Sequence, residues 1–225
     1  MTQPSPVSQN LTVTFNKPVI ASDLDWQLSQ EINVSTADGT VIAKAEIELI
    51  TLNKHRDALA SYELLDCEEG SDWEIPLNLY FTKQNLSADL CNSLLVKADT
   101  KAKTHIMLEA ISVHPDYRKQ GVARYLFTEI AKHHNKVQSM SVMSMPMPLF
   151  LDSETMSADQ GLDADNIAYY KSLQLASETI TADDVDQFFT AVGFQHFEID
   201  PSLLAEPLGF SVYVTSPNKL LSHIV

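Results

Sequence analysis

The sequence is organised around one stretch, residues 104–134, which reads THIMLEAISVHPDYRKQGVARYLFTEIAKHH. Its first part, residues 105–113, is mostly apolar with Glu109 as its only formally charged residue, and this composition predicts a β-strand. Pro115 ends the strand, because proline has no N–H to donate and biases the preceding residue toward extended geometry. From Gly121 onward, apolar residues recur at spacings of three and four, which predicts an amphipathic helix containing Val122, Ala123, Leu126, Phe127, Ile130 and Ala131.

The turn between this strand and this helix is suited to binding phosphate. The first turn of a helix has unpaired N–H groups and the positive end of the helix dipole. Arg118 and Lys119 lie in the turn, and Gly121 lets the backbone approach an anion without a Cβ atom in the way. The stretch therefore predicts an anion site at the start of the helix.

Residues 113–123, VHPDYRKQGVA, resemble the acyl-CoA-binding motif of the GNAT superfamily of N-acetyltransferases. In that motif Arg or Gln is followed by two residues, then Gly, one further residue, and Gly or Ala. The resemblance implies an α/β (α+β) fold with a central mixed, mostly antiparallel twisted sheet flanked by helices. It also implies that acetyl-CoA, or another acyl-CoA, is the co-substrate and that no metal is needed.

The resemblance places the cofactor at the end of the strand and in the turn. Backbone groups of Ile111 and Val113 would pair with pantetheine like an added strand, and one N–H there would polarise the thioester carbonyl. The implied cofactor-binding residues are Ile111, Ser112, Val113, Arg118, Lys119, Gln120, Gly121, Val122 and Ala123.

A second landmark lies at residues 183–194, DDVDQFFTAVGF. Gly193 ends a predicted helix, because glycine adopts the left-handed conformation at little cost. The segment resembles the family helix that has tyrosine four residues before a Gly-Phe pair. Here that position is Phe189, which has no proton to donate. Residues 194–199 and 210–215 are predicted as closing strands.

Glu109 is the candidate general base. Alternation along the strand places it on the face of Ile111 and Val113, and apolar neighbours such as Leu108 would raise its pKa by partial burial. Alternatively, Glu109 is an exposed strand residue that pairs with a lysine.

Tyr170 is the candidate general acid, in a helical segment of an acidic insertion that would have to fold back over the thioester. Tyr169 is the alternative residue for this role. The leaving thiolate could also take its proton from water.

Charge excludes some partners. The chain has 15 basic and 30 acidic residues, a net charge of −15, which argues against nucleic acid or an anionic membrane. Residues 97–136 contain eight basic and four acidic residues, as expected around an anionic cofactor, although Lys97, Lys101 and Lys103 also fit a solvated helix end. Residues 151–186 contain nine acidic residues and one lysine, which predicts a solvated loop or an acidic rim that attracts a cationic amine.

Length and composition predict one domain. With 225 residues and 44% hydrophobic content, we expect a flexible leader at residues 1–10 and a single domain over residues 11–225. Cys67 and Cys91 fit no metal spacing and are expected to be reduced thiols in a cytoplasmic protein. No apolar run is long enough to cross a bilayer.

The N-terminal half contains a hairpin and then helices. Residues 11–15 predict a strand, and residues 31–34 and 41–50 flank Asp38-Gly39, a strong hairpin signal. Helical spacing at residues 54–65 and 87–98 predicts a helical insertion at about 52–100, whereas the family has its early helices between the first two strands. The acidic insertion is placed at about 150–180. Residues 137–147 predict a strand whose methionines fill the core or line an acyl or acceptor channel.

The expected function is that of an acyl-CoA-dependent N-acyltransferase, which transfers acetyl to a primary amine of a small molecule or peptide by direct attack in a ternary complex. The expected partners are an acyl-CoA and an amine, which is cationic if the acidic segment attracts it, with no nucleic acid and no membrane, and the chain is a monomer or homodimer. Two alternatives stay open: a non-catalytic acyl-CoA-sensing or protein-binding module, and a generic nucleotide phosphate loop. The second lacks Gly-Lys-Ser/Thr and three spaced glycines.

Overall fold

The structure is a computed structural model of the chain. It describes residues 10–21, 26–53, 55, 57–65, 73, 77, 81–82, 85–96, 103–144, 164–173, 181–198 and 211–222. The elements in chain order are β1 Thr12–Phe15, β2 Val19–Ile20, β3 Gln27–Ser35, β4 Val41–Leu52, α1 Ala58–Leu65, β5 Phe81–Thr82, β6 Asn85–Leu86, α3 Ala88–Ser93, β7 Lys103–Val113, the 3₁₀ helix η2 Pro115–Tyr117, α4 Val122–His133, β8 Ser139–Ser144, α5 Ala164–Ser172, α6 Ala182–Val192, β9 Gln195–Phe197, β10 Ser211–Thr215 and α7 Pro217–Ser222.

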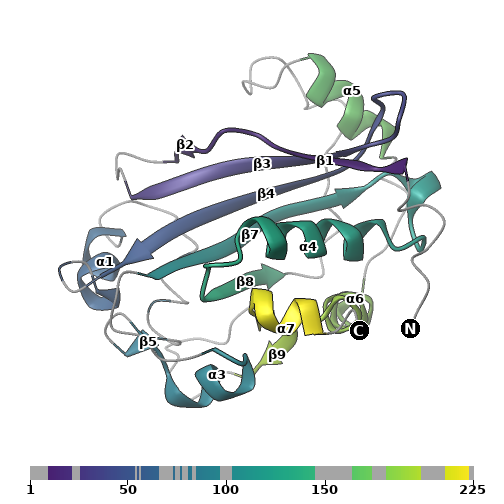
Figure 1. Cartoon of the computed structure of the whole chain (residues 1–225). Coiled ribbons are helices and arrows are strands. Elements are labelled where there is room, and N and C mark those ends of the chain that lie inside the picture. The colour runs from purple at the N-terminus through teal and green to yellow at the C-terminus, as the bar shows by residue number, and fades with distance from the viewer. Residues whose placement is uncertain are drawn as a thin grey trace.

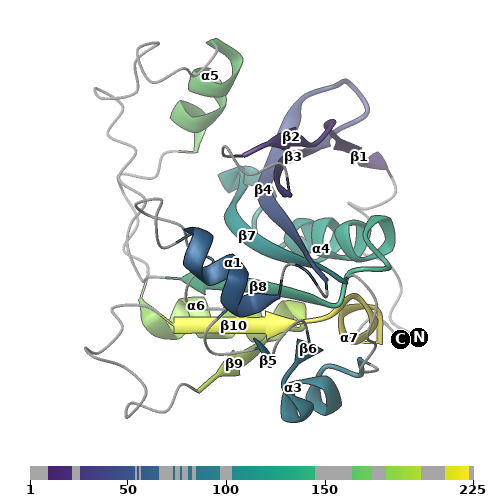
Figure 2. The same ribbon diagram turned by 90° about the vertical axis from the view of Figure 1, so that its left-hand side faces the viewer.

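The described strands form one large sheet and a small ribbon. In the large sheet the order is β1-β3-β4-β7-β8-β10-β9, with β2 also paired to β3, and the ribbon is β5-β6 (Figure 1; β6 and β10 are labelled in Figure 2). β7 and β8 pair in parallel, whereas the other neighbouring strands of the sheet pair antiparallel. Helices flank the sheet, so the predicted mixed, mostly antiparallel fold class is confirmed.

The N-terminal hairpin forms where the sequence predicts it. β3 and β4 pair from Gln27–Ile50 to Ser35–Val41, and Gly39 at the tip has a φ of 89°. A left-handed residue at this position suits the twist of two antiparallel strands, which explains why glycine stands there. Ala43 and Ile47 of β4 are fully buried, whereas Glu46 between them is exposed. One face of the hairpin therefore belongs to the core.

The predicted helical insertion follows the hairpin as α1, β5, β6 and α3. Ser87 caps α3, because its Oγ accepts a hydrogen bond from the Leu90 N–H at 3.4 Å. Trp73, with 1% of its surface exposed, packs with Ala58 of α1 and Met107 of β7. The insertion thus covers part of one face of the sheet.

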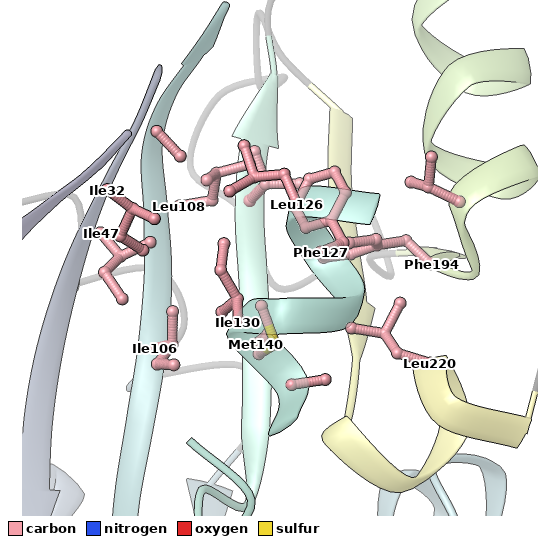
Figure 3. Packing of buried hydrophobic residues seen from close by; sticks show 14 of the residues in the cluster. Ile32, Ile47, Ile106, Leu108, Leu126, Phe127, Ile130, Met140, Phe194 and Leu220 are labelled. Carbon is pink, nitrogen blue, oxygen red and sulfur yellow. The ribbon is translucent and has the colours of Figure 1, made fainter. Parts of the chain in front are cut away.

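The opposite face is covered by α4, whose predicted apolar positions are buried. Leu126, Phe127 and Ile130 are at most 1% exposed and pack with residues of β4 and β7 such as Ile47 and Leu108 (Figure 3). Burial of one such side chain contributes about 1.5–3 kcal/mol, so several together fix the helix on the sheet. This packing holds the start of α4 beside the end of β7.

The C-terminal elements also match the predictions. α6 ends at Gly193, which has a φ of 104°, and the Phe194 N–H donates to the Phe189 carbonyl at 2.9 Å, which closes the helix end. β9 and β10 are the two predicted closing strands, and β8 includes Met140, which is buried in the core as ordinary packing predicts. Met145, Met147 and most of the acidic insertion lie outside the described residues.

Candidate functional site

β7 and β8 lie side by side only over their first residues. Their parallel pairing runs from His105–Ser139 to Met107–Ser141. β7 continues to Val113 and β8 to Ser144, and over these last residues no pairing joins the two strands. β8 instead stays paired with β10 on its other side. The strands therefore diverge beyond Met107, and no described strand pairs with the second half of β7 on the side where β8 began.

Backbone groups of Ile111 and Val113 lie along this edge. The His114 N–H donates to the Ile42 carbonyl of the β4 side at 2.8 Å. Because backbone groups alternate in direction along an antiparallel pair, those of Ser112 face β4 and those of Ile111 and Val113 face away from it. The edge thus offers donors and acceptors to an extended ligand, as the resemblance implies for pantetheine.

The turn after β7 leads into an uncapped helix. Gly121 precedes α4 with a φ of 85° and a ψ of 4°, and no side chain caps this helix. The first bond inside the helix runs from the Tyr125 N–H to the Gly121 carbonyl at 2.9 Å. The N–H groups of Val122 and Ala123 precede it, so they point to the helix N-terminus with the positive end of the dipole. This geometry suits a phosphate group.

The side chain of Arg118 supports the turn from within. Its Nε donates to the Val113 carbonyl at 3.0 Å, and its Nη2 donates to the Leu173 carbonyl, just after α5, at 3.4 Å. Gln120 likewise donates to the Asp116 carbonyl, at 2.6 Å. The Arg118 guanidinium therefore contacts two carbonyl groups, and a phosphate group at this turn would be bound by the backbone N–H groups.

The other predicted cofactor residues differ in exposure. Lys119 is exposed with a φ of 58°, Val122 is buried in the core, and Ala123 is half-buried. Lys103, predicted either near the anion or at a solvated helix end, is a β7 residue with 4% exposure. Lys97 and Lys101 lie outside the described residues.

Glu109 is the extra residue of a β-bulge. Glu46 of β4 is opposite Ala110 and Ile47 is opposite Leu108, so the register shifts across Glu109. The predicted placement of Glu109 on the face of Ile111 and Val113 is therefore wrong. Strict alternation would put Leu108 and Ile111 on opposite faces of β7, yet both pack in the same core cluster. The expected partial burial is also not found, since the Glu109 side chain is exposed. A bulge turns the inserted residue out of the regular pleat, which explains both differences.

The helix that carries the predicted acid reaches β7. Tyr170 lies in α5, but its side chain is outside the described part of the chain. The hydroxyl of Tyr169, the alternative residue, lies 3.0 Å from Ser112 Oγ, and Lys44 Nζ lies 4.9 Å from its ring centroid. Figure 2 shows α5 and α1 on one side of β4 and β7, with α4 on the other.

Phe189 is a core residue that stacks on a tyrosine which the sequence analysis did not single out. Its ring is 4% exposed and lies 4.9 Å from the ring of Tyr213 in β10, with an interplanar angle of 26°. Burial, together with the nearby Asp186 carboxylate, raises the pKa of Tyr213 above its usual value, although Ser211 opposes this. The 210–215 pattern predicted only a closing strand, and nothing local to it indicates contact with α6.

A family model supports the sequence resemblance. Residues 80–144, which include β7, the turn, α4 and β8, match the model described as the acetyltransferase (GNAT) family. These residues belong to the GNAT family. The match supports N-acetyltransferase activity that uses acetyl-CoA in general terms, and it covers under a third of the chain. No curated protein gives a significant match.

Solved structures give only a distant likeness to this chain. A bacterial toxin is 10% identical with a TM-score of 0.41, and the match covers 87% of this chain and 72% of the toxin chain. A mosquito arylalkylamine N-acetyltransferase-like protein, 5b, is 13% identical with a TM-score of 0.38, covering 82% and 73%. A Drosophila melanogaster polyamine N-acetyltransferase is 13% identical with a TM-score of 0.36, covering 83% and 74%. Such scores are too low to support a functional conclusion.

The described residues contain neither a metal-binding cluster nor a membrane-spanning helix. Among the described residues, no group of three or more His, Cys, Asp or Glu side chains could hold a metal ion. No described helix combines the length and the apolar character needed to cross a membrane.

His105, in the GNAT segment, gives a prediction about pH. It is fully buried, its Nδ1 lies 2.9 Å from Ser139 Oγ, and burial and then Lys103 lower its pKa to about 3. A histidine in the unfolded chain has a pKa of about 6.5, so on acidification the unfolded state binds a proton at His105 that the folded state does not bind. The free energy of unfolding should therefore fall below pH 6.5, by up to about 1.4 kcal/mol per pH unit from this residue.

Urea unfolding between pH 7.5 and 4.5 measures this effect. His105→Gln cannot take up a proton, so its free energy of unfolding should depend less steeply on pH. Some slope should persist, because burial and then His133 also lower the pKa of His134, to about 4. An unchanged slope in His105→Gln would contradict the prediction.

Proposed function

We propose that this chain is an acyl-CoA-dependent N-acyltransferase that transfers acetyl from acetyl-CoA to a primary amine of a small molecule or peptide. The reaction would be direct attack by the amine in a ternary complex. One observation carries the proposal: the second half of β7, from which β8 has diverged, leads straight into the uncapped N-terminus of α4, within a segment of the GNAT family. An edge strand and a phosphate site in this order fit a long ligand with a diphosphate at one end.

The residues of the site would act mainly by positioning. Backbone groups of Ile111 and Val113 would hold the pantetheine arm, and the amides from Gly121 to Ala123 would bind the diphosphate. Acetyl-CoA would supply the acyl group as a thioester. Holding this group in line with the amine can contribute roughly 7–11 kcal/mol in well-oriented cases.

Proton transfers are assigned to two residues. Glu109 would take the proton of the amine, because the bulge turns its exposed carboxylate out of the strand next to the diverging edge. Tyr170 would give a proton to the leaving thiolate. Its neighbour Tyr169 in α5 contacts Ser112 of that edge, which supports a position of this helix near the thioester. A backbone N–H of β7 would stabilise the negative charge that develops on the carbonyl oxygen.

A second candidate function is a non-catalytic acyl-CoA-sensing or protein-binding module. Phe189 favours it, because this buried ring occupies the position where the family landmark has a tyrosine hydroxyl. Such a module would bind acetyl-CoA in the same place but release no thiol.

Two measurements on the wild-type protein separate these possibilities. Acetyl-CoA should raise the melting temperature, and a panel of primary amines should release free CoA thiol in its presence. A thermal shift without thiol release from any amine would favour the sensing module. No thermal shift at millimolar acetyl-CoA would overturn both.

A further inference from the structure

Glu48 of β4 is a half-buried carboxylate held by two neutral donors. Its Oε2 accepts hydrogen bonds from the Trp73 indole N–H at 2.9 Å and from the Gln27 amide at 2.8 Å. Trp73 and Gln27 are 1% and 6% exposed, so both donors are fixed in place. Among the described residues, Oε1 has no hydrogen-bond partner, and no cationic side chain forms an ion pair with Glu48.

No described cationic side chain balances the negative charge of the Glu48 carboxylate. Partial removal from water raises the cost of the ionised group, and neutral donors offset that cost less than a cation does. A neutral acceptor could satisfy the indole and the amide equally well, so the structural role alone does not require a charged residue. The arrangement instead pre-orients one carboxylate oxygen and leaves the other available to a ligand.

Glu48 lies beside the point where β7 and β8 begin to diverge. Glu48 pairs directly with Met107, the last residue of β7 that pairs with β8. Its neighbours along β4, Ile47 and Leu49, pack in the core beneath α4, so Glu48 faces the other side of the sheet. That side carries α1 and α5 (Figure 2).

The cluster beside Glu48 is aromatic as well as apolar. Trp26 and Trp73 pack together with Met107 and α1 on this face. These buried rings limit access of water on one side of the carboxylate, which offers an ammonium group a charged hydrogen-bond acceptor. Glu109, the proposed base, follows Met107 by two residues on the neighbouring strand. A cation at Glu48 would therefore lie beside the place where the proton must be removed.

We propose that Glu48 binds the ammonium group of the acceptor, which assigns the acceptor to cationic aliphatic amines. This inference rests on the proposed acyltransferase function and extends it to a substrate class. Glu48 orients the amine through Oε1, while Trp73 and Gln27 hold Oε2. The amine then loses a proton to Glu109 before it attacks.

Glu48→Gln tests the proposal, because the amide keeps an oxygen that Trp73 and Gln27 can bind and removes only the charge. With hexylamine, a cation at neutral pH, the KM should rise about tenfold or more, as expected for the loss of a charged hydrogen bond. With aniline, which is neutral at this pH, KM should change little, and the acetyl-CoA thermal shift should persist. Glu46→Gln is the matched control, since Glu46 is two residues away on the same face and is exposed.

Each result decides the matter. A selective rise in the hexylamine KM for Glu48→Gln supports the proposal, whereas equal effects of the two variants, or no effect, overturn it. If the wild-type protein acetylates no amine, the acyltransferase function fails separately. Hexylammonium binding is then measured calorimetrically with wild type and Glu48→Gln, and equal affinities or no binding overturn the assignment of Glu48.

Discussion

Gly121→Glu is expected to abolish the rise in melting temperature that acetyl-CoA causes in the wild-type protein. Gly121 adopts a φ of 85° directly before the uncapped start of α4. A glutamate there would place a negative charge at the N–H groups proposed to bind the diphosphate, and its Cβ would occupy the space of close approach. Thermal unfolding with and without millimolar acetyl-CoA measures the change.

Gly39→Glu is the matched control for this variant. Gly39 has a φ of 89°, similar to that of Gly121, and a Cβ at this position would meet nothing within 4 Å. The control therefore introduces the same charge and a similar backbone strain at the tip of the N-terminal hairpin. It should lose some stability, yet keep the full acetyl-CoA shift. A shift retained by Gly121→Glu would refute the assignment of the phosphate site to this turn.

Glu109→Gln is expected to lower kcat by about 10²- to 10⁴-fold, as for loss of a general base, while the acetyl-CoA thermal shift stays at the wild-type value. The amide matches the carboxylate in size but accepts no proton. Because Glu109 is an exposed bulge residue, this change should leave the fold intact. Initial rates of thiol release, measured at saturating acetyl-CoA and amine, give the kcat values.

Glu129→Gln provides the comparison. Glu129 lies on α4, where it pairs with Lys132 at 2.6 Å, and it has no place in the proposed chemistry. Its kcat should equal that of the wild type. If Glu109→Gln and Glu129→Gln have the same kcat, Glu109 is not the base and the proton leaves by another route.

The strand, turn and helix around Gly121 could be predicted because their determinants are local. Pro115 ends β7, and spacings of three and four place Leu126 and Ile130 on one side of α4. Gly193 marks the end of α6 for the same reason, since a glycine after an amphipathic run predicts a helix terminus. Signals of this kind lie within a few residues of the feature that they predict.

The details of the site could not be predicted because they depend on contacts between distant residues. The bulge at Glu109 is defined by the register with β4, so period-two reasoning along β7 alone misplaces that side chain. Glu48 and Trp73 are 25 residues apart, and Ser112 and Tyr169 are 57 apart. No pattern within one segment indicates such pairs.

The two carbonyl contacts of Arg118 connect α5 to the edge of β7 that is proposed to hold pantetheine. Through one guanidinium, the end of β7 at Val113 and the end of α5 at Leu173 are linked. Any shift of the inserted helix when an acceptor arrives would be transmitted to the strand proposed to hold pantetheine. The two substrates would then bind with a mutual coupling energy, and linkage requires that each alter the affinity of the other by the same factor.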